Sequence, residues 1–169
     1  TTPAGQLTDY VHDKYGLLTR LDSKQGRENA RSIKYTYDQY DRLIKLDYGN
    51  GDIETRTYDS WGKLRSTERG DVKENYRYDY FGRMTAKTGT KEKLFITYNQ
   101  YGQRTRRQIE RNGIKMDETR FYDKYGRLQR IVSGSKTLEY IYNENNQIYQ
   151  QIINGTIIEF AYSKYGQLK

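Results

Sequence analysis

Aromatic side chains recur along this chain at a spacing that would suit a row of contacts to a sugar polymer. The segment YDKYGRL at residues 122–128 is one of eight related copies, which start 20 to 25 residues apart, and its fourth residue is aromatic in seven of the eight. If these rings are exposed, glycan rings can stack on them, but we favour the interpretation that they serve the structure of the repeat itself. The rings in question are Tyr40, Trp61, Phe81, Tyr101 and Tyr125.

The other chemistry-bearing residue types argue against catalysis. His12 is the only histidine, cysteine is absent, and the carboxylates are dispersed along the chain. His12 stands where the other copies have tyrosine, which indicates a structural substitute rather than a general base. No glycine-rich loop precedes a helical segment, and no thiolate metal site can form without cysteine. We therefore predict that the chain is not an enzyme and holds neither a catalytic site, a metal nor a cofactor.

The net charge of +8 raises the question of a polyanionic partner. The densest basic stretch contains Arg104, Arg106, Arg107 and Arg111. Strict strand alternation would place Arg104 and Arg106 on one face and Arg107 on the other, so that no single basic patch forms. We interpret the charge mainly as a solvated surface. An anionic wall polymer stays an alternative partner, whereas a specific nucleic acid is not expected.

The repeat predicts how these side chains are positioned. A period of about 20 residues indicates a stacked array of similar units. Each unit begins at an anchor residue, and the anchors are Tyr37, Tyr58, Tyr78, Tyr98, Tyr122, Tyr142 and Tyr162, with His12 in the first copy. The residue six positions after the anchor is apolar in every copy except one, which has Arg104. This residue should open the return strand and pack on the anchor or on the turn ring.

Two further columns of the repeat predict a tight turn. The residue after the anchor is Asp, Asn or Ser, whose side chain accepts a backbone N–H two residues on. The residue four after the anchor is Gly, Asp or Asn, the types that tolerate a positive φ. Together they predict a type I turn closed by a left-handed residue. The turn residues singled out are Asp38, Asp59, Asp79 and Asp123, with Gly62, Gly82, Gly102, Gly126 and Gly166.

The segments between these turns predict strands. Apolar residues alternate before several anchors, while other copies carry charges on the same face, as at Glu54 and Arg56, and those charges should pair between neighbouring strands. Second turn signals fall between copies, among them Thr88-Gly89 and Asn112-Gly113. We predict an all-β fold of tandem antiparallel β-hairpin repeats of about 20 residues. Roughly 14 to 16 short strands would form a curved or spiral sheet.

Composition places limits on this array. A mean hydropathy of −1.13 with this net charge is typical of disordered chains, but 19 tyrosines at recurring positions argue for a thin aromatic core. No apolar run reaches the roughly 18 residues of a membrane span. Neither end carries a capping unit, so residues 1–169 are interpreted as a single array cut from a larger protein. Its open edges would favour edge-to-edge self-association.

The columns resemble the YD-repeat, or Rhs-repeat, family, whose pattern is Tyr-x-Tyr-Asp, two residues, then Gly-Arg-Leu. Residues 35–38 (YTYD), 76–83 (YRYDYFGR) and 122–128 carry it almost intact. The resemblance covers essentially the whole chain. The copies that begin at His12 and Tyr142 depart furthest from the pattern.

The resemblance implies a function. Members include bacterial Rhs polymorphic toxins, wall-associated proteins, insecticidal Tc toxin components and teneurins, whose repeats wind into a hollow β-shell. In bacterial members the shell encloses a toxin at the C-terminal end. We therefore expect a non-catalytic wall segment of a secreted or cell-surface bacterial protein, with neighbouring repeats and a C-terminal cargo as partners. The alternative is an adhesion repeat that binds cell-surface carbohydrate or a wall polymer.

Overall fold

The computed structural model describes residues 6–25 and 31–169, and the secondary structure in these ranges consists of strands and turns. The chain divides into two compact units, residues 1–91 and 92–169, and both are built from the same hairpin repeat. The N-terminal end of the predicted array, residues 1–5, lies outside the described residues. No helix in the described part could span a membrane.

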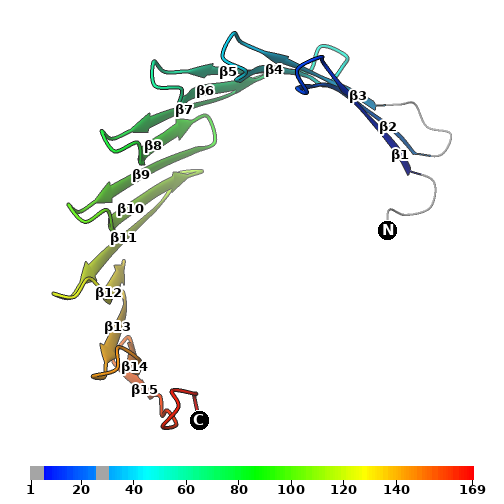
Figure 1. Cartoon of the computed structure of the whole chain (residues 1–169). Coiled ribbons are helices and arrows are strands. Elements are labelled where there is room, and N and C mark those ends of the chain that lie inside the picture. Colours follow the sequence, from blue (N-terminus) through cyan, green and yellow to red (C-terminus); the bar gives the residue numbers. More distant parts are fainter. Residues whose placement is uncertain (1–5, 26–30) are drawn as a thin grey trace. The chain divides into compact units, whose positions relative to one another are not determined.

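The first unit contains eight strands (Figure 1). They are β1 (Gln6–His12), β2 (Leu18–Gln25), β3 (Arg31–Tyr37), β4 (Leu43–Asp47), β5 (Ile53–Tyr58), β6 (Leu64–Arg69), β7 (Val72–Tyr78) and β8 (Met84–Gly89). The second unit contains seven. They are β9 (Glu92–Tyr98), β10 (Arg104–Arg111), β11 (Ile114–Tyr122), β12 (Leu128–Ser133), β13 (Lys136–Tyr142), β14 (Ile148–Ile153) and β15 (Thr156–Glu159).

Within each unit every strand pairs in antiparallel register with the next strand along the chain. This meander confirms the predicted all-β hairpin fold, and the described residues contain 15 strands, within the predicted range. Each repeat contributes two strands, because one turn follows the anchor and a second turn falls between copies. The order of elements therefore repeats the order of motifs in the sequence.

A β-bulge beside each anchor is the main local feature that the sequence pattern did not reveal. Phe121 lies opposite Arg130, but the next residue, Tyr122, lies opposite Leu128, so that one extra residue stands on the return strand. The same shift occurs in the other hairpins that begin at an anchor. The bulge sets the anchor directly opposite the apolar residue that opens the return strand, so that the two side chains share a face.

The hydrophobic core is thin. Among the described residues only Leu46 and Ala86 are buried apolar side chains. A layer of half-buried tyrosine, aliphatic and paired charged side chains replaces a deep core, as the tyrosine content predicted. Stability must therefore come mainly from strand pairing and from contacts between adjacent repeats.

Several of the second turns are two-residue loops with positive φ, for example at Asn112 (φ +50°) and Gly113 (φ +76°). One prediction among them was wrong. Gly89 is the last residue of β8 and is not a turn residue. A Cβ added at Gly89 would lie only 2.7 Å from the carbonyl oxygen of Lys73. Glycine therefore allows the two strands to approach closely at this point.

Candidate functional site

The turn that follows each anchor is held together by one carboxylate, amide or hydroxyl side chain. Asp123 Oδ1 accepts the backbone N–H groups of Tyr125 and Arg127, both at 2.9 Å. Gly126 donates its N–H to the carbonyl of Asp123 at 2.9 Å and has φ +79°. Side-chain bonds of this type recur at Asp13, Asp38, Asp59, Asp79, Asn99, Asn143 and Ser163. Positive φ recurs at Gly16, Asp41, Gly62, Gly82, Gly102, Asn146 and Gly166.

The basic residue that ends the turn connects one repeat to the next. Arg127 donates from Nε to Asp123 Oδ2 at 2.7 Å. Its guanidinium carbon lies 5.1 Å from the centroid of its own turn ring, Tyr125, and 4.4 Å from that of Tyr142, the next anchor. Arg42 has the same arrangement with Tyr40 and Tyr58. The arginine of the motif thus joins its aspartate to the following anchor ring through a cation–π contact.

In two of the copies that lack the arginine, an amide pair takes its place. Asn99 donates from Nδ2 to Gln103 Oε1 at 2.9 Å, and Gln103 Nε2 donates to the carbonyl of Gly126 in the next turn at 2.6 Å. Asn143 and Gln147 form a similar pair at 3.2 Å. At the two ends of these turns Asn stands with Gln, as Asp stands with Arg in three other copies, whereas Asp59 stands with Lys63. The signal lies in the sequence, in the pairing of the residues one and five positions after the anchor.

The anchor hydroxyl completes the hydrogen bonding between repeats. The β10–β11 ladder ends at Arg106 and Thr119, and beyond it Tyr122 donates its hydroxyl to the carbonyl of Arg104 at 2.8 Å. The corresponding bond to the residue that opens the preceding return strand is made by Tyr37, Tyr58, Tyr142 and Tyr162 at 2.7–2.9 Å. A phenylalanine would leave that carbonyl without this donor, which explains the choice of tyrosine.

Tyr78 and Tyr98 are the two remaining tyrosine anchors. Tyr78 lies 5.6 Å, ring centroid to nitrogen, from the ammonium group of Lys63, and Tyr98 stands opposite Arg104 in the β9–β10 ladder. Burial raises the pKa of the Tyr37, Tyr78 and Tyr142 hydroxyls. These hydroxyls therefore stay protonated, as hydrogen-bond donation requires.

The rings on the turns are exposed. The exposed fraction runs from 67% at Tyr40 to 84% at Trp61, with Phe81, Tyr101 and Tyr125 between them. Cations lie over several of these rings, as Arg83 does over Phe81 at 5.1 Å. Because the rings are open to solvent, they are available for contact with a partner, while the cations over them also give them contacts within the repeat.

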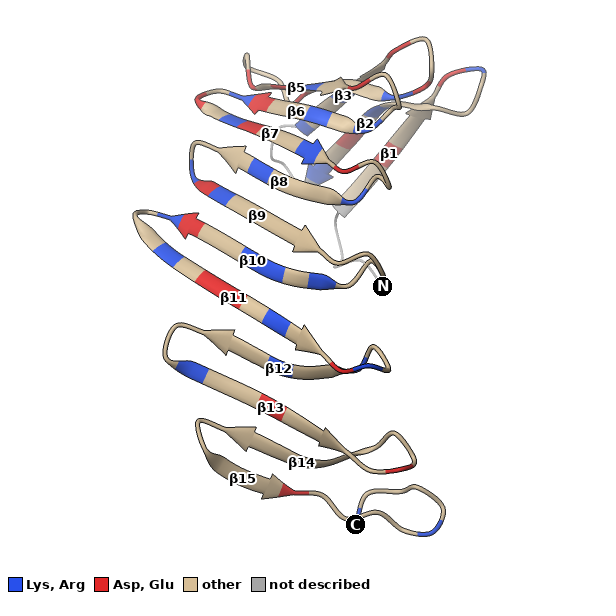
Figure 2. Ribbon diagram, turned by 90° about the vertical axis from the view of Figure 1, so that its left-hand side faces the viewer, with Lys and Arg blue, Asp and Glu red and all other residues tan. Residues whose placement is uncertain are grey.

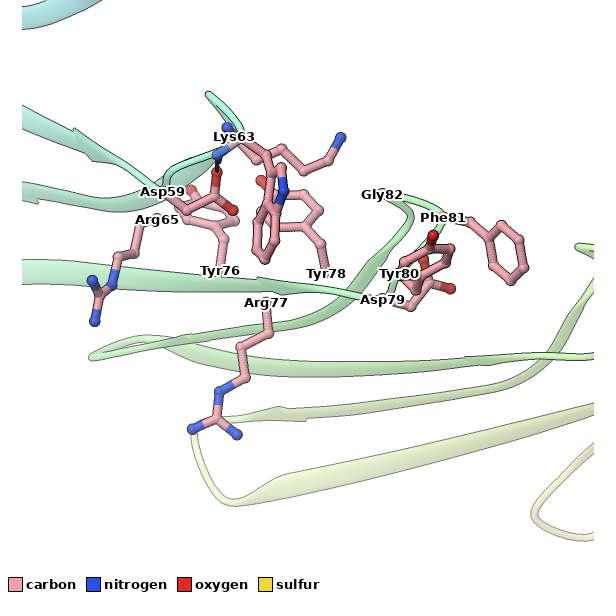
Figure 3. Close-up of a pocket in the computed structure, with 11 residues that line it drawn as sticks. Asp59, Lys63, Arg65, Tyr76, Arg77, Tyr78, Asp79, Tyr80, Phe81 and Gly82 are labelled. Carbon is pink, nitrogen blue, oxygen red and sulfur yellow. Dashed lines mark hydrogen bonds between the residues drawn. The ribbon is translucent and has the colours of Figure 1, made fainter.

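A groove of about 500 Å³ lies between two successive turns of the first unit. Its lining includes Asp59, Trp61 and Tyr78, and Figure 3 shows Tyr78 on one side of the strands while Arg65 and Arg77 extend from the other. The groove has aromatic walls, and charged side chains of both signs also line it. Among the described residues no cluster of His, Cys, Asp or Glu is arranged to hold a metal ion.

Solved structures with this architecture include Tc toxin components. The Photorhabdus luminescens Tc holotoxin pore with the TccC3-D651A mutation gives a TM-score of 0.70 at 15% identity, with 98% of this chain and 11% of that chain covered. TcdB2-TccC3 without its hypervariable C-terminal region gives the same values, and TcdB2-TccC3-Cdc42 gives 0.68 at 13% identity, with 96% and 10% covered.

This chain has a Tc-toxin-like fold. It spans about a tenth of the length of those chains. No family model matches the sequence, and no curated protein matches it either.

Within this Tc-toxin-like fold, charges on the anchor-bearing face pair between neighbouring strands, as expected. Lys87 of β8 contacts Glu74 of β7 at 2.7 Å, and Arg104 of β10 contacts Glu118 of β11 at 3.1 Å. Other pairs form along one strand, as between Arg56 and Glu54 at 2.7 Å. The face is therefore polar and largely self-compensated.

The predicted placement of the basic stretch was wrong. The β-bulge on β10 sets Arg104 opposite Tyr98 and Arg106 opposite Thr97, and these two partners point to opposite faces. Arg107 lies opposite Ile96 and so shares the face of Arg104. Figure 2 shows the basic segments of β10 beside the acidic middle of β11. One inserted residue thus brings two arginines together that simple alternation had separated.

Proposed function

We propose that this chain is a non-catalytic wall segment of a larger β-shell that encloses a C-terminal cargo in a secreted or surface-delivered bacterial Rhs-like protein. One observation carries the proposal: successive repeats are fixed to one another by strand pairing, by anchor hydroxyls and, where the turn ends in arginine, by its contact with the next anchor ring. Such links can continue for any number of repeats, as a wall requires. The Tc-toxin-like fold supports the same role.

The wall would act passively. Its backbone N–H and C=O groups are satisfied by neighbouring strands, so a continuous sheet separates a cargo from solvent without a specific chemical step. The anchor hydroxyls extend this closure past the ends of the strand ladders, where a gap in the hydrogen bonding would otherwise begin. No side chain of the segment needs to act as an acid, a base or a nucleophile.

Limited proteolysis of the full natural protein that contains this chain tests the role. We expect the C-terminal cargo to resist protease while the wall is intact. Replacing both Tyr122 and Tyr142 by Phe should speed cleavage of the cargo, because two links between repeats are lost. The matched change Tyr125→Phe, on an exposed ring, should leave protection unchanged. A cargo that is cleaved as fast in the unaltered protein as it is after denaturation would disprove enclosure.

The exposed rings favour a second candidate, an adhesion repeat that binds glycan or an anionic wall polymer. Paired strands lie about 4.8 Å apart, so rings on successive hairpins are spaced by about 10 Å, which a sugar polymer could follow. Trp61 is the only tryptophan, so its fluorescence reports directly on this row. Quenching or a blue shift on addition of wall polysaccharide, lost in Trp61→Ala with the fold intact, would support adhesion. An unchanged spectrum at saturating polysaccharide would reject it.

A further inference from the structure

Arg104 occupies the position six residues after the anchor, where it replaces an apolar side chain and lowers the stability of the fold. The other copies place an apolar residue at this position on the anchor-bearing face. Arg104 Nε is buried there without a hydrogen-bond partner, while Nη2 donates to Glu118 Oε1 at 3.1 Å. A buried, unpaired N–H of a charged group is unfavourable, and a leucine would remove it. Local violations of a consistent design are expected at functional positions.

The neighbours of Arg104 leave positive charge uncompensated. Arg120 donates from Nε to the same oxygen of Glu118 at 2.7 Å. Arg107 stands directly opposite Glu118 in the β10–β11 register, which places their Cβ atoms about 5 Å apart. Two guanidinium groups therefore share one carboxylate, and the third arginine stands opposite that carboxylate's residue in the register, so that positive charge exceeds negative charge in this cluster. By contrast, Arg106 on the opposite face forms a bidentate pair with Asp117.

The surroundings of this cluster indicate what kind of anion it would take. Ile96 lies opposite Arg107, and Ile109 follows two residues later on the same face of β10. Tyr98 and Tyr122 flank Arg104, the first opposite it and the second bonded to its carbonyl. A ligand must therefore combine negative charge with apolar groups, as a polypeptide with alternating acidic and apolar side chains does. Guanidinium forks match planar carboxylates in particular.

We propose that Arg104, Arg107 and Arg120 form a site that binds a carboxylate side chain of an acidic, partly apolar polypeptide segment. The inference extends the proposed function, because an enclosed cargo would supply such a segment on the anchor-bearing face. The test of this site does not require an enclosed cargo, because peptide binding is measured on this chain by itself. Glu118 orients the guanidinium groups, and the incoming carboxylate supplies the second negative charge that they lack.

The test is fluorescence anisotropy of the full chain with a fluorescein-labelled peptide in which Glu and Leu alternate. The matched probe has Gln in place of every Glu. The variants are Arg104→Leu, which restores the column residue, and Arg106→Leu, which removes the same charge from the opposite face of β10. A thermal unfolding midpoint is recorded for each variant, so that loss of folding is recognised directly.

The expected result is opposite changes in binding and stability. Arg104→Leu should weaken binding of the Glu peptide by roughly tenfold or more, because a charge-assisted contact is lost, and should raise the unfolding midpoint. Arg106→Leu should leave affinity within about twofold, since Arg106 is already paired on the other face. The Gln peptide should bind at least tenfold more weakly than the Glu peptide, for the same reason.

Several outcomes would overturn the proposal. Absence of binding by the unaltered chain, equal binding of the two peptides, or equal losses in the two variants would each reject a specific carboxylate site. Displacement of the peptide by micromolar inorganic phosphate would assign the cluster to phosphate and reject the peptide partner. Intact peptide binding together with an unprotected cargo in the full protein would reject enclosure alone, which keeps the two proposals separable.

Discussion

The hydroxyl of Tyr142 lies 2.7 Å from the carbonyl oxygen of Leu128, the residue that opens the return strand of the preceding repeat. The β12–β13 ladder ends at Arg130 and Glu139, two residues short of this point. The bond therefore continues the pairing of two repeats with a side chain where the backbone no longer reaches. It links residues that are 14 positions apart, and its counterparts occur along both units.

Removing this hydroxyl should measurably weaken the array. We expect Tyr142→Phe to lower the free energy of unfolding by about 1 kcal/mol, because the carbonyl of Leu128 loses its donor in a partly buried place. Urea unfolding followed by circular dichroism measures the change. Tyr125→Phe is the matched control, since Tyr125 is 69% exposed, and it should have no effect. Equal stability of both variants would show that the anchor hydroxyl is dispensable.

The fold could be predicted from the sequence because each repeat carries its own local signals. The repeat period predicted a stacked array, the alternation of apolar residues predicted strands, and the residues around Gly126 predicted the turn. Strands and turns could be predicted because they depend on residues only a few positions apart. The tyrosine content indicated a thin core, and Leu46 and Ala86 are the buried apolar residues of the described part.

The contacts between repeats could not be predicted in the same way. The hydroxyl bond from Tyr122 to Arg104 joins positions 18 residues apart, so no local pattern contains it. The faces of Arg104 and Arg106 depend on a bulge, and one inserted residue reverses every alternation that follows it. The exposure of the turn rings, such as that of Trp61, depends on what lies beyond the turn and not on the motif.

A β-branched residue at Gly126 should be strongly destabilising. Gly126 has φ +79°, and an added Cβ would lie 3.3 Å from Gln103 Nε2, which donates to the Gly126 carbonyl. We expect Gly126→Val to cost about 1–3 kcal/mol through backbone strain alone. Thermal and urea unfolding measure the loss.

The matched control for this strain is the same turn position in the next repeat. Asn146 already holds φ +62° there. Asn146→Gly should therefore cost no more than the hydrogen bond that Arg127 Nη1 donates to Asn146 Oδ1 at 2.7 Å, because glycine adopts this conformation without a steric penalty. A Gly126→Val variant as stable as the unaltered chain would contradict the assignment of strain to this position.

Acid should destabilise the turns through their aspartates. The hydrogen bond from the Arg42 side chain holds the pKa of Asp38 below its ordinary value. At Asp123 burial acts to raise the pKa, but the backbone N–H and guanidinium of Arg127 outweigh it and lower the pKa overall. A pKa that is depressed by folding gives stability above the unfolded value of about 3.9, and that stability is lost as pH falls through the folded pKa.

We therefore expect the unfolding midpoint to be steady near neutral pH and to fall below about pH 4. Thermal unfolding by circular dichroism between pH 7 and pH 2 measures this. In the double variant Asp38→Asn with Arg42→Gln, the contribution of this turn should disappear and the acid slope should become shallower. A midpoint that rises toward pH 2 would show that the aspartates do not stabilise the folded state.

The two ends of the turn should tolerate substitution only as a pair. Asp123 with Arg127 and Asn99 with Gln103 fill the same positions with matched hydrogen-bonding groups. Asp123→Asn alone removes the charge partner of Arg127, and Arg127→Gln alone leaves Asp123 without its guanidinium, so each should lower the unfolding midpoint by a few degrees. The double variant should lose less than the sum of the two, since an amide pair replaces the ion pair. Thermal unfolding of all four proteins closes the cycle, and additive losses would mean that the two side chains do not act together.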